Sequence, residues 1–389
     1  MNIQEIQREI RAEKLDGWLF FDHHQRDPIA YRVLDFMPKG IISRRWYYFI
    51  PAEGEPRGLV HKIESYHLDS LPGKKSSYAG WAEQKQGIAQ LLEGTRRIAM
   101  QYSPECAIPY VAMVDGGTLE LVRTLNVEIA SSANLVQYFE ARLNQEQVDS
   151  HLEAGILVDE IRRDAFKLIG DRIRGGIRVT EWEVQEFIKQ RFSAAGLFTD
   201  HGPNVSVNAN SSNPHYEPEQ KTSAEIFTGD IVLIDLWAKF DRPSAVYYDV
   251  TWMGSCGPRP PSAVENVFAV VSGARKKAVE RVQSAISAGE DLRGYQVDDA
   301  ARSYIDGKGF GPYFFHRTGH SIGTEVHGTG ANMDNLETHD DRKVIPWTIF
   351  SIEPGVYLPE FGVRSEVNMF IGEGSARVTG ESQDSLVLI

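Results

Sequence analysis

Two adjacent apolar segments in the second half of the chain each carry an aspartate where a buried strand would otherwise hold an apolar residue. They lie within residues 229–254, GDIVLIDLWAKFDRPSAVYYDVTWMG. β-Branched and aromatic residues dominate both segments, and the polar stretch 241–244 between them is typical of a turn, so the pattern predicts an antiparallel hairpin. With the turn centred on Arg242, paired residue numbers sum to 484, which places Asp235 directly opposite Asp249.

The two aspartates have two interpretations. Taken singly, each is a structural carboxylate satisfied by hydrogen bonds as often as it is a ligand, because buried acids are normally paired. Directly opposed carboxylates have Cβ atoms about 4.5–5.5 Å apart and destabilise a sheet unless a positive charge lies between them. The pair therefore favours a bound cation. A slip of one residue or a bulge would instead make the two side chains diagonal neighbours.

A cluster of histidines follows further along the chain. The segment FFHRTGHSIGTEVHG contains His316, His320 and His327, separated by glycines. A single histidine is more often a hydrogen-bonded structural residue than a ligand. Three within twelve positions, among glycines that permit close approach of the backbone, favour a site.

Two glutamates near strand ends extend the set of candidate ligands. Glu353 follows TIFSI and precedes a Pro-Gly pair, so a turn would hold its carboxylate at the end of a strand. Alternation in VRSEVNMF places Arg364, Glu366 and Asn368 on one face of a strand. A charged face within a buried sheet needs a counter-ion.

Composition limits the class of protein. The chain has 389 residues, which favours two domains, and its formal net charge of −13 disfavours nucleic acid as a partner. With only Cys106 and Cys256, a disulfide framework is not expected. Neither a signal peptide nor an apolar run of membrane-spanning length is recognisable. We therefore expect a cytoplasmic enzyme or binding protein with no membrane partner.

Helical and strand patterns differ between the two parts of the chain. Residues 1–142 alternate between helices and strands and predict a small α/β domain. Residues 143–389 combine long helical patterns with the β-rich stretches that carry the candidate ligands, which predicts an α+β domain with helices outside a curved antiparallel sheet. Thr180 and Glu183 form a capping-box pattern at the start of one of these helices.

The ordered residues resemble a known family. Asp, Asp, His, Glu and Glu occur in the contexts IDLWA, YYDVT, GHSIG, IEPGVY and VRSEV. This arrangement resembles the pita-bread metallopeptidases, which include methionine aminopeptidase, prolidase, aminopeptidase P and creatinase. The resemblance covers the chain from residue 143 and implies a pita-bread catalytic domain. The position of residues 1–142 fits a creatinase-type N-terminal domain.

The resemblance implies a site for two divalent metal ions. Asp249 and Glu366 would contact both ions, Asp235 would complete the shell of the first, and His320 and Glu353 that of the second. Mn²⁺ is the first expectation, from the richness in carboxylates and from the family; Co²⁺, Zn²⁺ and Fe²⁺ remain open because affinity does not choose among them.

Further matches indicate the branch that acts on proline-containing peptides. His215 in NPHYEP, His316, His327 and Arg364 resemble site residues of prolidase and aminopeptidase P. On its own, His215 is equally consistent with a solvated loop histidine. The implied activity is a metal-dependent exopeptidase that hydrolyses the bond before a proline, as a prolidase or an aminopeptidase P.

The implied mechanism uses a hydroxide that bridges the two metals, because coordination lowers the pKa of bound water from about 15.7 towards about 7. Glu353 would take the proton and pass it to the leaving nitrogen. His327 would help to stabilise the oxyanion. His215 and His316 would orient the substrate, and Arg364 would bind the substrate carboxylate or hold the last glutamate.

Three departures from the family pattern keep alternatives open. The connection at 241–244 is enlarged, Ser365 and Val367 replace the isoleucine and aspartate that normally flank the last glutamate, and ANMDNLETHDDR is a polar elaboration. A relative with non-peptide chemistry, such as a lyase or amidinohydrolase, is therefore the alternative. A non-catalytic binding protein is less favoured because all five ligands are retained. The family also implies a homodimer.

Overall fold

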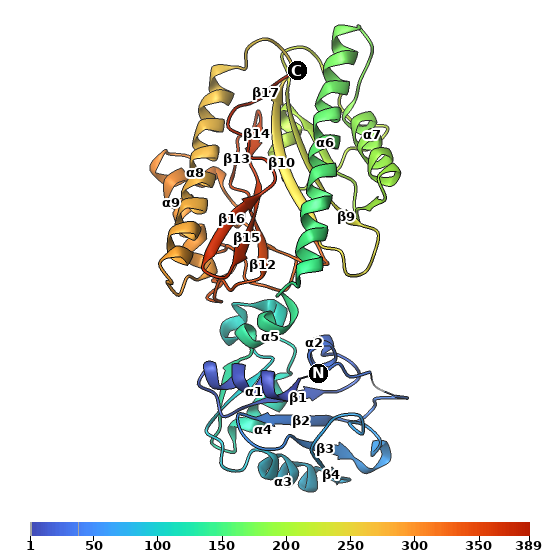
Figure 1. The fold of residues 1–389 in the computed structure, drawn as a ribbon, viewed down its shortest axis with the longest axis vertical. Coiled ribbons are helices and arrows are strands. Elements are labelled where there is room, and N and C mark those ends of the chain that lie inside the picture. The colour runs from blue at the N-terminus through green and yellow to red at the C-terminus, as the bar shows by residue number, and fades with distance from the viewer. Residues whose placement is uncertain (1, 38) are drawn as a thin grey trace. The chain divides into compact units, whose positions relative to one another are not determined.

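The computed structural model describes residues 2–37 and 39–389 (Figure 1). The chain divides into two compact units, Met1–Glu140 and Ala141–Ile389. The predicted boundary after residue 142 lies just beyond this division. The assignment of the first unit to a creatinase-type domain stays a prediction.

The first unit is a mixed sheet between two layers of helices. Within its described residues the sheet has six strands in the order β4-β3-β2-β1-β5-β6. The strands are β1 (Gly17–Asp22), β2 (Trp46–Pro51), β3 (Arg57–His61), β4 (Lys74–Tyr78), β5 (Arg97–Met100) and β6 (Glu128–Ser131). The helices are α1 (Ile3–Ala12), α2 (Pro28–Val33), α3 (Trp81–Leu91), α4 (Gly116–Arg123) and α5 (Ala133–Glu140).

Strand β1 explains why this sheet is covered on both faces. Trp18 and Phe20 pack with α1, α2 and α5, whereas Leu19 and Phe21 pack with α3 and α4. A strand that is apolar on both faces must be buried on both, and a sheet between helices does this. The expected α/β pattern of this part is confirmed.

The second unit contains the longer helices and several small sheets. The strands are β7 (Leu197–Phe198), β8 (Asn204–Val207), β9 (Ile231–Phe240), β10 (Tyr248–Ser255), β11 (Ser321–Ile322), β12 (Thr348–Ile352), β13 (Gly355–Tyr357), β14 (Gly362–Arg364), β15 (Val367–Gly372), β16 (Ser375–Thr379) and β17 (Val387–Leu388). The helices are α6 (Gln145–Arg174), α7 (Glu181–Ala194), α8 (Ser262–Ser287) and α9 (Gly294–Gly307). One sheet has the order β17-β10-β9-β7 with β8 also paired to β9, another has the order β11-β12-β15-β16, and β13 pairs with β14.

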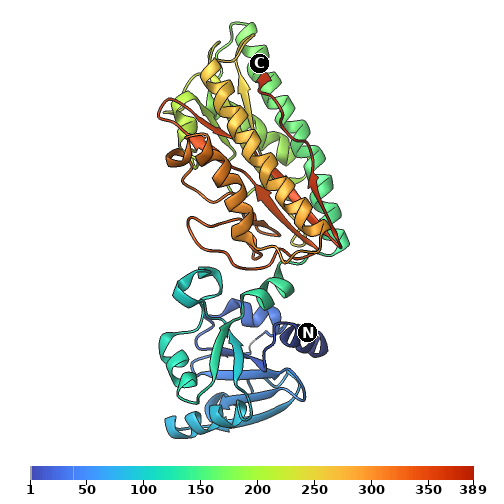
Figure 2. The same cartoon turned by 90° about the vertical axis from the view of Figure 1, so that its left-hand side faces the viewer.

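The helices of the second unit lie on opposite sides of its strands. Helices α6 and α7 lie on one side and α8 and α9 on the other, and α8 passes in front of the strands in Figure 2. The predicted α+β architecture, with helices outside antiparallel sheets, is confirmed. Helix α7 begins with the predicted capping box, in which Glu183 accepts the Thr180 N–H at 2.9 Å and Thr180 Oγ1 accepts the Glu183 N–H at 3.2 Å.

The register predicted for the hairpin was wrong, because each residue pairs with a partner two positions further along the chain than expected. Asp249 lies opposite Trp237, and Asp235 lies opposite Thr251. The chain between the strands turns later than expected, where the Ala245 N–H donates to the Arg242 carbonyl at 3.1 Å. Because the shift changes each partner by two residues, the two aspartates become diagonal neighbours but stay on one face of the sheet.

The two faces of β9 have different surroundings, and this places the site. Val232, Ile234 and Leu236 pack in the apolar cluster with α6 and α7. Ile231 and Leu233 point the other way and pack in the cluster that contains α8. Asp235 continues this second face, so its carboxylate points away from α6 and α7 and into the space between the sheets.

Candidate metal centre

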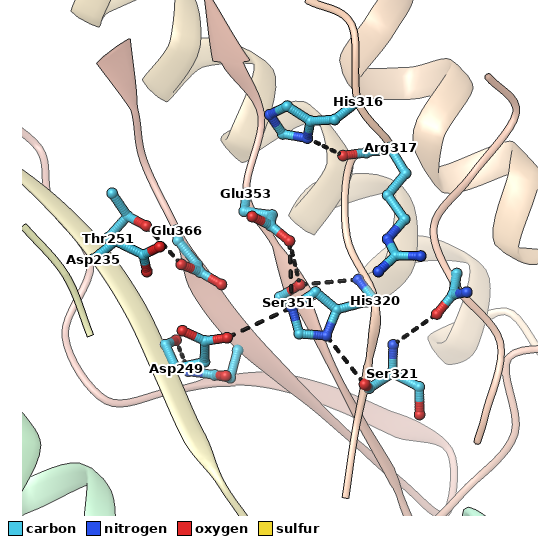
Figure 3. A network of polar contacts seen from close by, with 12 residues as sticks. Asp235, Asp249, Thr251, His316, Arg317, His320, Ser321, Ser351, Glu353 and Glu366 are labelled. Carbon is cyan, nitrogen blue, oxygen red and sulfur yellow. Dashed lines mark hydrogen bonds and ion pairs between the residues drawn. The ribbon is translucent and has the colours of Figure 1, made fainter. Parts of the chain in front are cut away.

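Three side chains that the sequence separates widely come together on the inner face of the sheets. Asp249 lies on β10, His320 directly precedes β11, and Glu366 lies between β14 and β15. One ligand-type atom from each lies within 4.8 Å of those of the other two, and all three residues are buried (Figure 3). Such a set of two carboxylates and one imidazole suits a divalent cation.

Glu353 belongs to the same cluster. Its Oε1 atom lies 3.4 Å from His320 Nε2, and Asp249 Oδ2 lies 3.5 Å from the same nitrogen. Ser351 holds both residues, because its Oγ accepts the His320 N–H at 3.0 Å and donates to Glu353 Oε1 at 3.1 Å. The end of β12 therefore fixes the imidazole and the glutamate relative to one another.

The orientation of the His320 ring indicates what lies in front of it. His320 Nδ1 is 3.1 Å from the carbonyl oxygen of Ser321. That contact requires the proton to be on Nδ1, which leaves a lone pair on Nε2. This lone pair faces the oxygens of Asp249 and Glu353, an arrangement that is repulsive unless a cation or a proton lies between them.

Asp235, the remaining predicted ligand, is ion-paired. Its Oδ2 atom accepts from the guanidinium of Arg364. Arg364 Nε donates to Thr251 Oγ1 at 2.9 Å, and the same hydroxyl donates to Glu366 Oε2 at 2.8 Å. Arg364 thus contacts Asp235 directly and reaches Glu366 through Thr251. One of the two roles predicted for Arg364 was to hold Glu366. In the structure Arg364 does so through the Thr251 hydroxyl and not by a direct hydrogen bond.

The carboxylates of the cluster have strongly shifted pKa values. Burial, reinforced by the neighbouring Glu353, raises the pKa of Asp249 well above the usual carboxyl range. Burial together with Asp249 and Glu353 does the same for the pKa of Glu366. Burial would also raise the pKa of Glu353, but His320 and Arg364 outweigh it and the net shift is downward. The site holds more negative charge than its own cations neutralise.

Two oxygen atoms provide a test of whether a metal fits. Asp249 Oδ1 and Glu366 Oε1 are buried and have no hydrogen-bond partner among residues 2–37 and 39–389. Buried carboxylate oxygens without partners are strongly unfavourable, whereas a divalent cation would satisfy both. The donor set therefore fits a metal centre.

The cluster lines a cavity of about 670 Å³. Its wall contains all five predicted ligands and also His215, His316, His327 and Arg364, so every predicted site residue reaches the same cavity. The side chain of His215 is exposed. His327 packs edge-on against His320, with ring centroids 4.5 Å apart.

His316 is held in one orientation. Its Nδ1 lies 2.6 Å from the Arg317 carbonyl oxygen, and its Nε2 lies 2.8 Å from the Tyr357 hydroxyl. Burial lowers the pKa of His316 to about 4, so the ring is neutral at physiological pH. With the proton on Nδ1, Nε2 accepts from Tyr357.

Several residues that shape the site were not predicted from the sequence. Thr251 and Ser351 each lie two positions from a predicted ligand, and the two-residue period of a strand places them on the same face. That signal could have found them. Tyr357 and Arg317 also line or support the cavity, but their roles depend on contacts between separate segments.

The shifted pKa values predict how the stability of the metal-free protein depends on pH. Above the ordinary histidine pKa of about 6.5, the buried histidines are neutral in both the folded and unfolded states. In the folded protein the pKa values of Asp249 and Glu366 are raised above those of unfolded carboxyls, which lie near 4, so the folded carboxyls hold their protons to higher pH. Wherever the folded state binds more protons than the unfolded state, the free energy of unfolding should fall as pH rises, by up to about 1.4 kcal/mol per pH unit for each proton.

Thermal or urea unfolding across this pH range, in chelator and in excess divalent metal, measures the effect. The metal-loaded protein should show a much weaker dependence, because the bound cation neutralises the same carboxylates. Equal slopes with and without metal would contradict the assignment of these residues to the cation.

Comparison with known proteins identifies the class of enzyme. The chain matches metallopeptidase family M24 over residues 149–373, more than half of its length, and all five predicted ligands lie in that region. The fold and the match make this chain a metallopeptidase. It belongs to the metallopeptidase family M24, and the predicted resemblance to pita-bread metallopeptidases is confirmed.

Three relatives illustrate the similarity. The chain is 27% identical to the uncharacterized peptidase YqhT of Bacillus subtilis over 266 residues, which are 67% of this chain and 70% of that protein. It is 33% identical to the Xaa-Pro dipeptidase of Pyrococcus horikoshii over 153 residues, 39% of this chain and 40% of that one. The crystal structure of dipeptidase PepE from Mycobacterium ulcerans matches 100% of this chain and 96% of its own, with a TM-score of 0.65 and 20% identity.

Proposed function

We propose that the protein is a metal-dependent exopeptidase that hydrolyses Xaa-Pro bonds, with two divalent cations at the cluster. The observation that carries this proposal is the lone pair of His320 Nε2, which faces Asp249 and Glu353 carboxylate oxygens at 3.4–3.5 Å. A cation between these atoms makes that arrangement favourable. The unpartnered oxygens of Asp249 and Glu366 support the same conclusion.

The residues that would hold the cations are Asp235, Asp249, His320, Glu353 and Glu366. Bound cations would supply Lewis acidity and an activated water. Glu353 is placed to move the proton of the attacking water to the leaving nitrogen, because its carboxylate lies 3.4 Å from His320 Nε2 and lines the cavity. His316, which is kept neutral by burial and oriented by Tyr357, and His327 line the same cavity.

Features of the cavity support a proline-containing peptide as substrate. Trp237, Phe315 and Val326 line the same cavity and would offer apolar surface to a pyrrolidine ring. The names of relatives agree, since one of them is an Xaa-Pro dipeptidase. A cavity of this volume suits a short peptide.

The alternative with non-peptide chemistry depends on the altered residues near Glu366, and their positions weaken it. Ser365 accepts a hydrogen bond from buried Arg275 of α8 at 2.6 Å. Val367 is buried in the apolar cluster that includes α8. Both side chains therefore point away from the cavity, where a change of substrate would have to be made.

One assay tests the proposal. Purified protein, freed of metal and then loaded separately with Mn²⁺, Co²⁺, Zn²⁺ or Fe²⁺, is incubated with Xaa-Pro dipeptides, with Xaa-Pro-Yaa peptides and with Xaa-Ala controls. Metal content is measured on the same samples. We expect metal-dependent cleavage of the Xaa-Pro peptides with Mn²⁺ most effective, and none in chelator. Absence of cleavage by a protein that carries a full complement of metal would refute the proposal.

Other expectations stay predictions. A homodimer and a cytoplasmic location follow from the resemblance and the composition. Among the described residues, none of the helices combines the length and the apolar character required to cross a bilayer.

A further inference from the structure

Glu181, the first residue of α7, has a buried carboxylate that is bonded from several segments. Its Oε1 accepts the Val207 N–H at 2.7 Å and the Asn210 side-chain amide at 2.9 Å. Its Oε2 accepts the Tyr216 hydroxyl at 2.6 Å and the Ala224 N–H at 2.8 Å. These donors are neutral, and the side chain of Glu181 has no exposed surface.

Burying a carboxylate in the protein interior costs free energy that burying an apolar side chain does not. Removing its charge from water is unfavourable unless its oxygens are well hydrogen-bonded, and an apolar side chain of similar volume would avoid that penalty. The carboxylate instead holds the groups that donate to it in fixed positions, because charge-assisted hydrogen bonds are short and directional.

The segments that Glu181 joins include the one that carries His215. The side chain of His215 is exposed and lines the cavity, so its position depends on the backbone on either side of it. Before it, the Pro214 carbonyl accepts from Asn204 Nδ2 at 3.2 Å and from Arg364 at 3.5 Å. After it, Tyr216 is fixed by Glu181.

We infer that Glu181 is a positioning residue, which holds Tyr216 and thereby keeps His215 directed into the cavity. This inference rests on the proposed function, in which His215 orients the peptide. The contact is made from behind the cavity wall, so Glu181 itself does not touch substrate.

A double-mutant cycle between Tyr216→Phe and His215→Ala tests the inference. Tyr216→Phe removes one hydroxyl and leaves the other donors to Glu181 in place. It is expected to lower kcat/KM for an Xaa-Pro dipeptide by roughly tenfold, mainly through KM. In the His215→Ala background the same change should lower kcat/KM by less than about twofold, because the group that it positions is already gone. An equal effect in both backgrounds would overturn the inference.

A matched control lies on the same helix. Glu183→Ala removes the capping box of α7 but no contact to the segment of His215, so it should lower the melting temperature and leave KM unchanged. If Tyr216→Phe fails to fold, Glu181→Gln replaces it, since the glutamine amide would point a donor at other donors.

A second readout does not require activity. In protein labelled at the histidine rings, the His215 resonance, assigned with His215→Gln, is expected to shift and broaden in Tyr216→Phe while the His316 resonance stays unchanged. An unperturbed His215 resonance would exclude the positioning role even in a protein that cleaves nothing. Failure of the wild-type protein to cleave Xaa-Pro peptides would refute the proposed function and leave this measurement valid.

Discussion

Replacing Glu353 with glutamine is expected to lower kcat on an Xaa-Pro dipeptide by on the order of 10²–10⁴-fold, the usual contribution of a general acid–base group. The glutamine has the same shape but cannot accept a proton. The substitution also removes the negative charge of the Glu353 carboxylate, whose Oε1 atom lies 3.4 Å from His320 Nε2, so the affinity for one metal should fall as well. Steady-state kinetics at saturating metal, with metal content measured on the same samples, separates these two effects.

The control for this substitution is Glu360→Gln. Glu360 is exposed and follows β13 by a few residues, so the same chemical change there should leave kcat within about twofold. Near-normal turnover by a metal-loaded Glu353→Gln protein would contradict the proton-transfer role. A loss that excess metal fully restores would assign Glu353 to metal binding alone.

Replacing Asp249 with asparagine is expected to have opposite effects in the presence and absence of metal. With metal, activity should fall by at least about 100-fold, because the variant loses an anionic ligand of the cluster. In chelator, the variant should melt at a higher temperature than the wild-type protein. Its neutral amide cannot ionise, so it avoids the cost of a buried charge beside Glu353; burial, reinforced by Glu353, is also what raises the pKa of Asp249.

Thermal denaturation of both proteins, with and without metal, measures this reversal. Asp241→Asn is the matched control, since Asp241 is exposed at the turn of the same hairpin and should change neither quantity. If Asp249→Asn destabilises the chelated protein, the carboxylate is a structural group satisfied by its neighbours, the interpretation that the sequence left open.

The fold and the set of predicted site residues followed closely from the sequence where the signal is local. The capping box of Thr180 and Glu183 and the apolar strands on either side of residues 241–244 depend on neighbours within a few positions. The register of that hairpin was wrong because it depends on where the turn is centred, and Pro243 and Ser244 allow more than one centre. The period of two still kept Asp235 and Asp249 on one face.

The supporting contacts could not be predicted because they join distant segments. Arg364 pairs with Asp235, 129 positions earlier in the chain, and Tyr357 bonds to His316, 41 positions earlier. Nothing in the local pattern at Arg364 distinguishes an ion pair with Asp235 from contact with a substrate. Likewise, Ser365 was read as a change in the site, but its hydroxyl accepts from Arg275 on α8.

The order of the five candidate ligands along the chain has a consequence for synthesis of the protein. The first, Asp235, and the last, Glu366, are separated by most of the matched domain, and each of the five comes from a different strand or strand end. A nascent chain that has emerged only to residue 350 would carry three of them without the partners that complete the cluster. Since such a site forms only when the sheets are assembled, metal loading must follow folding of the whole domain, and a cell short of metal would accumulate a folded apoprotein whose buried carboxyl groups lack their cations.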